Sequence, residues 1–184
     1  MGIPRYPGKT LLFVGALFSK KDSYLEAYHA LQKAFGEVIM ETPPVRWDFS
    51  EHYKEEMGEP LFRRFLFFKD LIEPDKLSEI KLMTNDLESE LGTEGKRNIN
   101  LDPGYLTFAK IVLASTKNYS HRIYLNKGIF AEVTLIFSKT EGKFIPNINT
   151  YNDYKDERYG KFFLLARDLF YFLSSDSHTK SDGL

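Results

Sequence analysis

Hydrophobic residues recur at two different spacings along the chain, and these spacings predict its strands and helices. A short apolar run at 10–18 is typical of a buried strand. Segment 22–35 has apolar residues at helical spacing and is followed by Gly36, a residue that favours the end of a helix. Further strands are predicted at 37–41, where two prolines follow, and at 61–68, whose apolar spacing also fits a helix.

The rest of the chain contains the clearest predicted helix and then changes to strand spacing. Residues 45–59 have no regular period, and we expect an irregular segment there. The helix is predicted at 73–91. Polar and apolar residues then alternate at 97–102, as far as Pro103 and Gly104, where we expect a turn. The remaining predicted elements are strands at 110–116, 121–125 and 130–138, a short strand near Phe144, and a helix at about 156–174.

The order of these elements predicts an α+β fold. Up to Leu101 the order is strand, helix, strand, strand, helix, strand, which is the ferredoxin-like βαββαβ arrangement. An antiparallel β-meander and a C-terminal helix extend this start. We therefore expect a mostly antiparallel sheet with helices packed on one face. The domain organisation predicted is a single domain at 1–174 and a polar tail at 175–184 that we expect to be disordered.

Composition and charge exclude several classes of protein. The chain has 184 residues, which suits one domain, and its 25 Lys and Arg against 26 Asp and Glu give a net charge of −1. A near-neutral chain lacks the strong positive field of a protein that coats nucleic acid, so nucleic acid is not an expected partner. The absence of cysteine excludes disulfides and thiolate metal sites.

The N-terminal region predicts neither a membrane segment nor a phosphate-binding loop. Its apolar run at 11–18 is shorter than the roughly 20 residues that a membrane helix needs, and no signal-peptide cleavage site follows it. We therefore expect a cytoplasmic protein with no membrane partner. Gly8, Lys9 and Thr10 match the end of a phosphate-binding loop, but Gly2 is one residue too distant and a strand follows instead of a helix.

Polar side chains on two predicted strands, together with a basic turn, form the candidate site. Asn100 and Asp102 share one face of their strand, and Glu132 and Thr134 share one face of theirs, because successive side chains alternate. The opposite face of the second strand is expected to carry Ala131, Val133, Leu135 and Phe137. If both strands belong to one sheet, we expect the two polar faces to converge with the basic turn. A solvated outer face of a sheet would show the same alternation.

The basic turn contains Lys117, His121 and Arg122, which we expect to receive an anion. Asp102 and Glu132 would hold a divalent metal ion such as Mg²⁺ or serve as a general base, and His121 is the third candidate catalytic residue. The neighbouring amide and hydroxyl groups would orient the ligand. An exposed basic turn with no ligand is the alternative interpretation.

The last predicted helix is apolar on nearly all sides. Only Arg167 and Asp168 interrupt the apolar residues between 162 and 173. Such a helix must be covered on more than one side. Either the core of one molecule covers it or a second copy does so in a homodimer, and the sequence leaves both open.

Six blocks of sequence carry a family resemblance. They are 48–58, 100–105, 111–117, 121–125, 128–135 and 150–154. In this order the blocks resemble a bacterial family described as domain of unknown function 4416. The resemblance implies a cytoplasmic, single-domain bacterial protein and no established activity. Tyr53 and Glu56 lie in the first block, and we add them to the candidate ligand-binding residues.

Two functional hypotheses follow from these observations. In the first, the chain binds or acts on a phosphorylated small molecule or nucleotide together with a divalent metal. In the second, it is a non-catalytic, homodimeric interaction or regulatory module that associates through its last helix. The sequence does not decide whether the chain is an enzyme.

Overall fold

The computed structural model describes residues 2–179, and their side chains as far as residue 175. The strands are β1 (Leu11–Phe18), β2 (Val38–Glu41), β3 (Val45–Trp47), β4 (Leu61–Phe68), β5 (Ile99–Leu106), β6 (Lys110–Ser115), β7 (Ile123–Asn126), β8 (Ile129–Ser138) and β9 (Lys143–Pro146). The helices are α1 (Lys21–Phe35), α2 (Glu51–Met57), α3 (Leu77–Glu90) and α4 (Glu157–Thr179), with short 3-10 helices η1 (Pro74–Lys76) and η2 (Asn152–Lys155).

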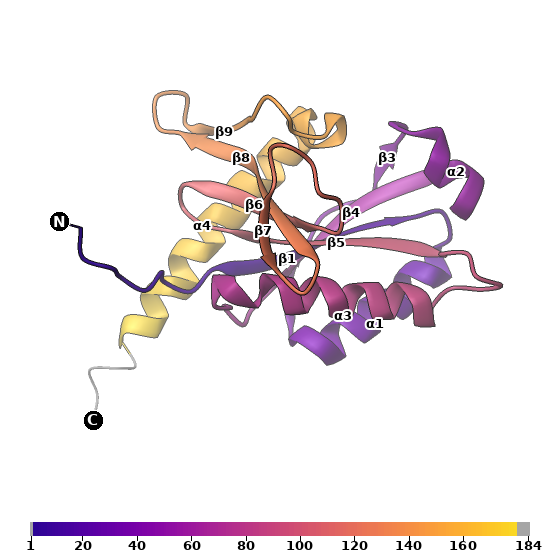
Figure 1. Ribbon diagram of the computed structural model, residues 1–184, viewed down its shortest axis with the longest axis horizontal. Coiled ribbons are helices and arrows are strands. Elements are labelled where there is room, and N and C mark those ends of the chain that lie inside the picture. The colour runs from indigo at the N-terminus through magenta and orange to yellow at the C-terminus, as the bar shows by residue number, and fades with distance from the viewer. Residues whose placement is uncertain (1, 180–184) are drawn as a thin grey trace.

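The strands form one antiparallel sheet of nine strands (Figure 1). Its order is β2-β4-β1-β5-β6-β8-β7, with β3 paired to β4 and β9 paired to β8. β1 lies inside the sheet, between β4 and β5, and all eight of its residues are buried. The predicted α+β fold with an antiparallel sheet is confirmed, and 61–68 is a strand.

The first part of the fold contains more elements than the simple βαββαβ start predicted from the sequence. α1 links β1 to β2 and α3 links β4 to β5, and in each case one strand lies between the two that are linked. β3 and α2 are inserted between β2 and β4, in the segment 45–59 that we expected to be irregular. Trp47 and Met57 anchor the insertion by packing on Leu17 and Leu61. These few apolar residues order a segment that is otherwise polar.

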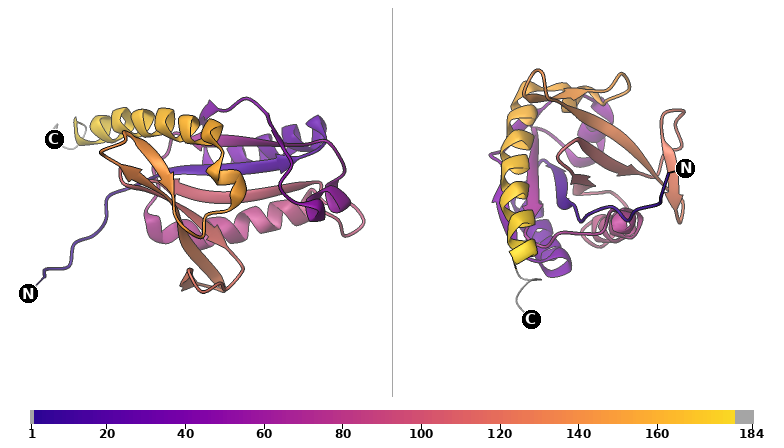
Figure 2. Two further views of the ribbon diagram at one scale, coloured as in Figure 1. Left: turned by 90° about the horizontal axis from the view of Figure 1, so that it is seen from above. Right: turned by 90° about the vertical axis from the view of Figure 1, so that its left-hand side faces the viewer.

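Helices cover both faces of the sheet, so the prediction that they share one face is wrong. Alternate residues of β1 point to opposite sides. Leu12 and Val14 pack with residues of α1, whereas Leu11 and Phe13 pack with Phe163 and other residues of α4. In the right-hand view of Figure 2, α4 runs along one side of the strands and α1 and α3 lie beneath them. The apolar last helix supplies the second layer that the sheet needs.

β5 continues through Pro103 and Gly104, where the sequence predicts a turn. At Pro103 the strand is paired with β1, and pairing with β6 begins only at Gly104, so proline sits where one side of β5 has no partner strand. A Cβ atom on Gly104 would lie 2.5 Å from the Val112 carbonyl oxygen and 2.6 Å from the Phe13 ring. Gly104 is therefore required for close packing rather than for a turn.

A bulge in β8 overturns the simple alternation predicted for 130–138. Ile111 of β6 pairs with Leu135, and the next residue, Val112, pairs with Val133, so Thr134 is the additional residue. As a result Val133 packs in the core beside α3, whereas Leu135 packs in the core beneath α4. The four residues expected on one face are therefore divided between the two faces of the sheet, two before the bulge and two after it. Ala131 and Val133 face α3, and Leu135 and Phe137 face α4.

The C-terminal boundary also differs from the prediction. α4 extends to Thr179, so the first residues of the predicted disordered tail are helical, and 180–184 lie outside the described residues. Within residues 2–179 no helix has the length and apolar character needed to span a membrane.

Candidate functional site

The predicted site residues occupy two polar clusters on the face of the sheet that α4 also covers. Arg63 lies on this face because it is two residues before Phe65, which packs with α4. Glu132 lies there because it pairs with Leu113 of the same core. We name the Arg63 cluster for Tyr53, Glu56, Arg63, Glu88, Arg97, Asn100, Asp102 and Asp153. We name the Arg122 cluster for Ser115, Lys117, Tyr119, His121, Arg122, Glu132, Thr134 and Tyr151.

Arg63 is the buried centre of the first cluster. Its side chain is 4% exposed, and its guanidinium group contacts Asp102 at 2.7 Å and Asp153 at 3.3 Å. The Trp47 indole N–H donates to Asp153 at 3.1 Å, and the Asn100 amide donates to Asp102 at 2.8 Å. Burial acts to raise the pKa of Asp102, but the nearby Arg63 guanidinium outweighs it and the pKa falls below its ordinary value. Asp102 is thus held as a carboxylate by its arginine.

Arg97 forms the outer part of the same cluster. Its guanidinium group donates to Glu56 at 2.6 and 2.8 Å and to the Asn100 side-chain oxygen at 2.8 Å, and it lies 3.4 Å from Glu88. It also lies over the Tyr53 ring, 5.5 Å from the centroid. Burial raises the pKa of Tyr53 to about 12, so its hydroxyl is protonated at neutral pH.

The charges of the Arg63 cluster do not favour an anionic ligand. Its two arginines face four carboxyl groups, and the buried Lys81 is a further cation that acts on Asp102 and Glu88. Lys81 itself donates to the Leu101 carbonyl oxygen at 2.8 Å. The cluster has no surplus of positive charge, and its arginine donors are largely occupied by these carboxylates.

The Arg122 cluster is built around a guanidinium group whose nitrogens all have partners. Arg122 donates to Glu132 at 2.7 Å, to the Ser115 hydroxyl at 2.6 Å, to the Lys117 carbonyl at 3.0 Å and to the Tyr151 hydroxyl at 2.5 Å. The rings of Tyr119 and Tyr151 lie 4.6 and 5.4 Å from the guanidinium carbon. These contacts fix the short loop between β6 and β7 against β8.

Glu132 contacts a second basic side chain as well as Arg122. Its carboxylate lies 3.2 Å from His121 Nε2 and accepts a hydrogen bond from the Thr134 hydroxyl at 3.2 Å. Lys117 is exposed at the same loop, and its ammonium group has no ion-pair partner among the described side chains of residues 2–175. Even with a neutral imidazole, the two cations Lys117 and Arg122 face one carboxylate here. The Arg122 cluster therefore has a surplus of positive charge.

The structure brings the two clusters near each other without joining them directly. Asn100 contacts Asp102, and His121, Arg122 and Thr134 contact Glu132, but no hydrogen bond or ion pair within residues 2–179 links Asp102 to Glu132. The segment before α4 connects the clusters, because Tyr151 belongs to one and Asp153 to the other.

The carboxylates predicted to hold a metal ion are occupied by arginines. Asp102 is paired with Arg63 and Glu132 with Arg122. Among the side chains that the structure describes, no group of three or more His, Cys, Asp or Glu is arranged to hold a metal ion. A divalent cation would have to displace a guanidinium group from either carboxylate, so the donor set does not fit the expected Mg²⁺ site.

Arg63, Arg97, Asp153 and Tyr151 were not among the residues selected from the sequence. Arg63 could have been found, since it shares its strand face with Leu61, Phe65 and Phe67 and is the one charged residue among them. Asp153 carries no such signal, because its partner is 90 residues away in the chain.

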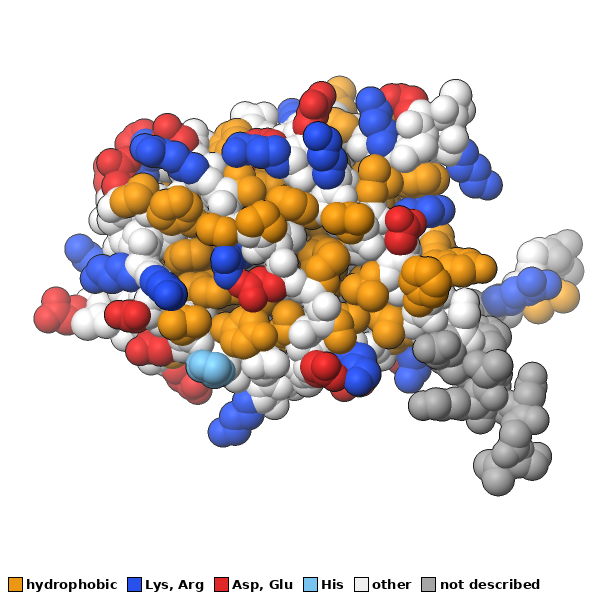
Figure 3. Space-filling model, turned by 180° about the vertical axis from the view of Figure 1, so that it is seen from behind, with side chains coloured by type: hydrophobic (Ala, Val, Ile, Leu, Met, Phe, Trp, Pro, Cys, Tyr) orange, Lys and Arg blue, Asp and Glu red, His pale blue; other side chains and the backbone are white. Residues whose placement is uncertain are grey.

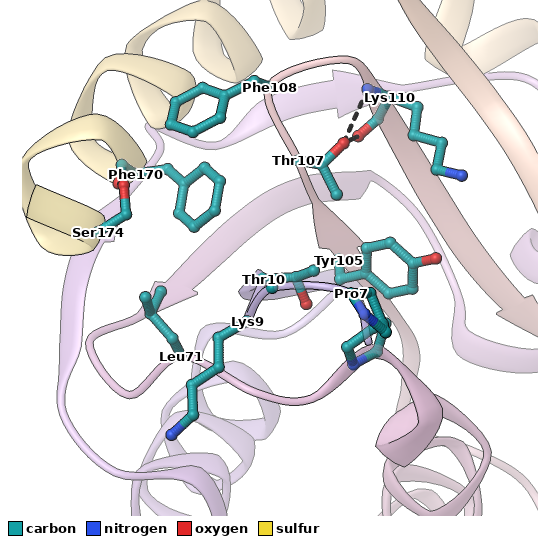
Figure 4. A pocket seen from close by; sticks show the side chains of 12 residues that line it. Pro7, Lys9, Thr10, Leu71, Tyr105, Thr107, Phe108, Lys110, Phe170 and Ser174 are labelled. Carbon is teal, nitrogen blue, oxygen red and sulfur yellow. Dashed lines mark hydrogen bonds between the residues drawn. The ribbon is translucent and has the colours of Figure 1, made fainter. Parts of the chain in front are cut away.

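A hollow of about 720 Å³ lies apart from both clusters, between the N-terminal segment, the β5–β6 turn and α4 (Figure 4). Its walls include Leu71, Phe108 and Phe170. Lys9 and Lys110 border it, but their side chains extend away from its centre in Figure 4. None of the predicted site residues lines this hollow.

Comparison with known proteins gives one match. The family model described as "Domain of unknown function (DUF4416)" matches residues 8–170. No curated protein and no solved structure gives a significant match.

Proposed function

The chain belongs to the DUF4416 family, a domain of unknown function, and we propose that it binds a phosphorylated small molecule or nucleotide at the Arg122 cluster. Glu132 carries this proposal, because one buried carboxylate holds both Arg122 and His121 in place beside Lys117. Basic side chains that are held in place before the ligand arrives, as Arg122 and His121 are, lose little conformational entropy on binding. The surplus of positive charge in this cluster favours an anion.

Lys117 and His121 are the proposed contacts to the phosphate. The His121 side chain is 23% exposed, and Glu132 occupies only its Nε2 atom, which leaves Nδ1 for a ligand. The side chain of Arg122 is 1% exposed, so its proposed role is to position the loop rather than to touch the ligand. Glu132 likewise positions the side chains of His121 and Arg122, and the Thr134 hydroxyl group positions Glu132.

The exposed rings of Tyr119 and Tyr151 favour a ligand with a flat group, such as a nucleotide base. Both rings already flank the Arg122 guanidinium group, and both remain partly open to solvent. Aromatic faces of this kind stack on bases. In this proposal Tyr53, Glu56, Asn100 and Asp102 stabilise the fold and do not touch the anion, since their cluster has an excess of acid.

Isothermal titration calorimetry tests this proposal. The probes are inorganic phosphate, pyrophosphate, and the adenosine and guanosine triphosphates. We expect Lys117→Ala with His121→Ala to weaken binding of at least one probe by about tenfold or more, because a hydrogen bond to a charged group contributes about 1.5–3 kcal/mol.

Lys139→Ala is the matched control, since Lys139 is an exposed lysine in the turn between β8 and β9. It should bind as the unaltered chain does. If no probe binds at millimolar concentration, or if the double variant and the control bind equally well, the proposed anion site is wrong.

A further inference from the structure

The outer face of α4 carries apolar side chains that the rest of the chain does not cover. The inner residues Phe163, Ala166 and Phe170 are buried against the sheet, whereas Leu165 is 59% and Phe172 is 66% exposed. Figure 3 views the molecule from the side on which α4 lies and shows hydrophobic side chains gathered across this face. Exposed apolar surface of this kind is typical of an interaction site.

Charged residues on the outer face of α4 define which partner fits. One line of this helix, which we call the stripe, contains Lys161, Leu165, Asp168 and Phe172, because they follow one another at spacings of four, three and four residues. Lys161 and Asp168 are exposed, and neither has an ion-pair partner among the side chains described, those of residues 2–175. The stripe thus has an unpaired cation before Leu165 and an unpaired anion after it.

We infer that this stripe binds a second copy of the chain, with the two α4 helices antiparallel and related by a twofold axis near Leu165. In such an interface the same surface is used twice, and residues at equal distances on either side of the axis meet. The midpoint between Lys161 and Asp168 falls between Leu164 and Leu165, so an axis at this point places the two charged residues at equal distances from it. Each Lys161 therefore meets the partner's Asp168, and the two Leu165 side chains pack together between these ion pairs.

The balanced charge favours a copy of this chain over an anionic membrane surface. A helix that binds such a surface carries an excess of Lys and Arg on its polar face. Here one cation and one anion flank the exposed Leu165, and the whole chain has a net charge of −1. The stripe is complementary to itself, which requires no other partner.

Sedimentation velocity of the full chain over about 1–100 µM tests the interface, with four variants. We expect a dimer for the unaltered chain and a monomer for Leu165→Glu. Lys161→Glu and Asp168→Lys should each raise the dissociation constant of the dimer at least tenfold, since each creates two like-charge contacts. The double variant Lys161→Glu with Asp168→Lys exchanges both charges and should restore dissociation to within about threefold of the original.

Lys33→Glu on the outside of α1 is the control for a charge reversal elsewhere, and it should leave the dimer unchanged. Circular dichroism verifies that every variant is folded. A chain that is monomeric at 100 µM overturns the proposal. So does a dimer that the single reversals leave intact, or one that the double variant fails to restore.

Discussion

Arg63 and Arg64 are neighbours in β4, yet their environments predict very different contributions to stability. Arg63 is buried between Asp102 and Asp153, whereas Arg64 lies on the opposite face of the strand, partly exposed, and pairs with Glu41. Removing one partner of a buried ion pair leaves uncompensated charge, which costs about 3–5 kcal/mol. A partly exposed pair contributes about 1 kcal/mol or less.

We therefore expect Arg63→Ala to lower the free energy of unfolding by about 3–5 kcal/mol and Arg64→Ala by about 1 kcal/mol. Urea denaturation followed by circular dichroism measures both values. Equal, small losses in the two variants would show that the Arg63 network does not stabilise the fold.

The sequence predicts contacts between residues of one strand better than contacts between residues of distant segments. The alternation of β5 correctly places Asn100 and Asp102 on one face, where they share a hydrogen bond. Asp153 reaches Arg63 only because η2 folds back over the sheet, and that path depends on the tertiary structure. The ion pairs that neutralise the expected metal ligands were therefore not predictable from spacing.

Two expectations about single strands are wrong: the turn predicted within β5 and the regular alternation predicted for β8. Pro103 and Gly104 are common turn residues, but β5 tolerates the proline where it lacks a second neighbouring strand and needs the glycine for packing. The bulge at Thr134 changes which face Leu135 occupies, and no local residue preference marks it. Strand positions follow from hydrophobic spacing, whereas such irregularities follow from pairing with distant strands.

A substitution at Gly104 tests this interpretation of β5. We expect Gly104→Ala to lower the free energy of unfolding by about 2–3 kcal/mol, because the added methyl group collides with backbone of β6 and the Phe13 ring. Thermal and urea denaturation measure the change. Gly8→Ala is the control, since nothing lies within 4 Å of the added atom. Equal stability of both variants would contradict the packing role.

For the whole molecule, the sequence predicts the fold class but not the arrangement of its layers. The α+β class and the antiparallel sheet follow from the order of the elements. The position of α4 does not, because a helix that is apolar on nearly all sides is compatible with several partners. In the structure one side of α4 meets the sheet and the other remains exposed at Leu165 and Phe172. The core of the molecule therefore covers one side of this helix, and the homodimer that the sequence also allows stays a prediction for the other side.

The central position of β1 has a consequence for how fast its backbone amides exchange hydrogen with solvent. β1 is paired on both sides and buried on both faces, so its amides should exchange only when the whole molecule unfolds. β7 is exposed and, in the part of the chain that the structure describes, pairs with β8 alone, so local opening should suffice there. Exchange measured by NMR should give β1 an opening free energy equal to that of global unfolding, and β7 a value several kcal/mol lower. Similar values in both strands would mean that the sheet opens as a single unit.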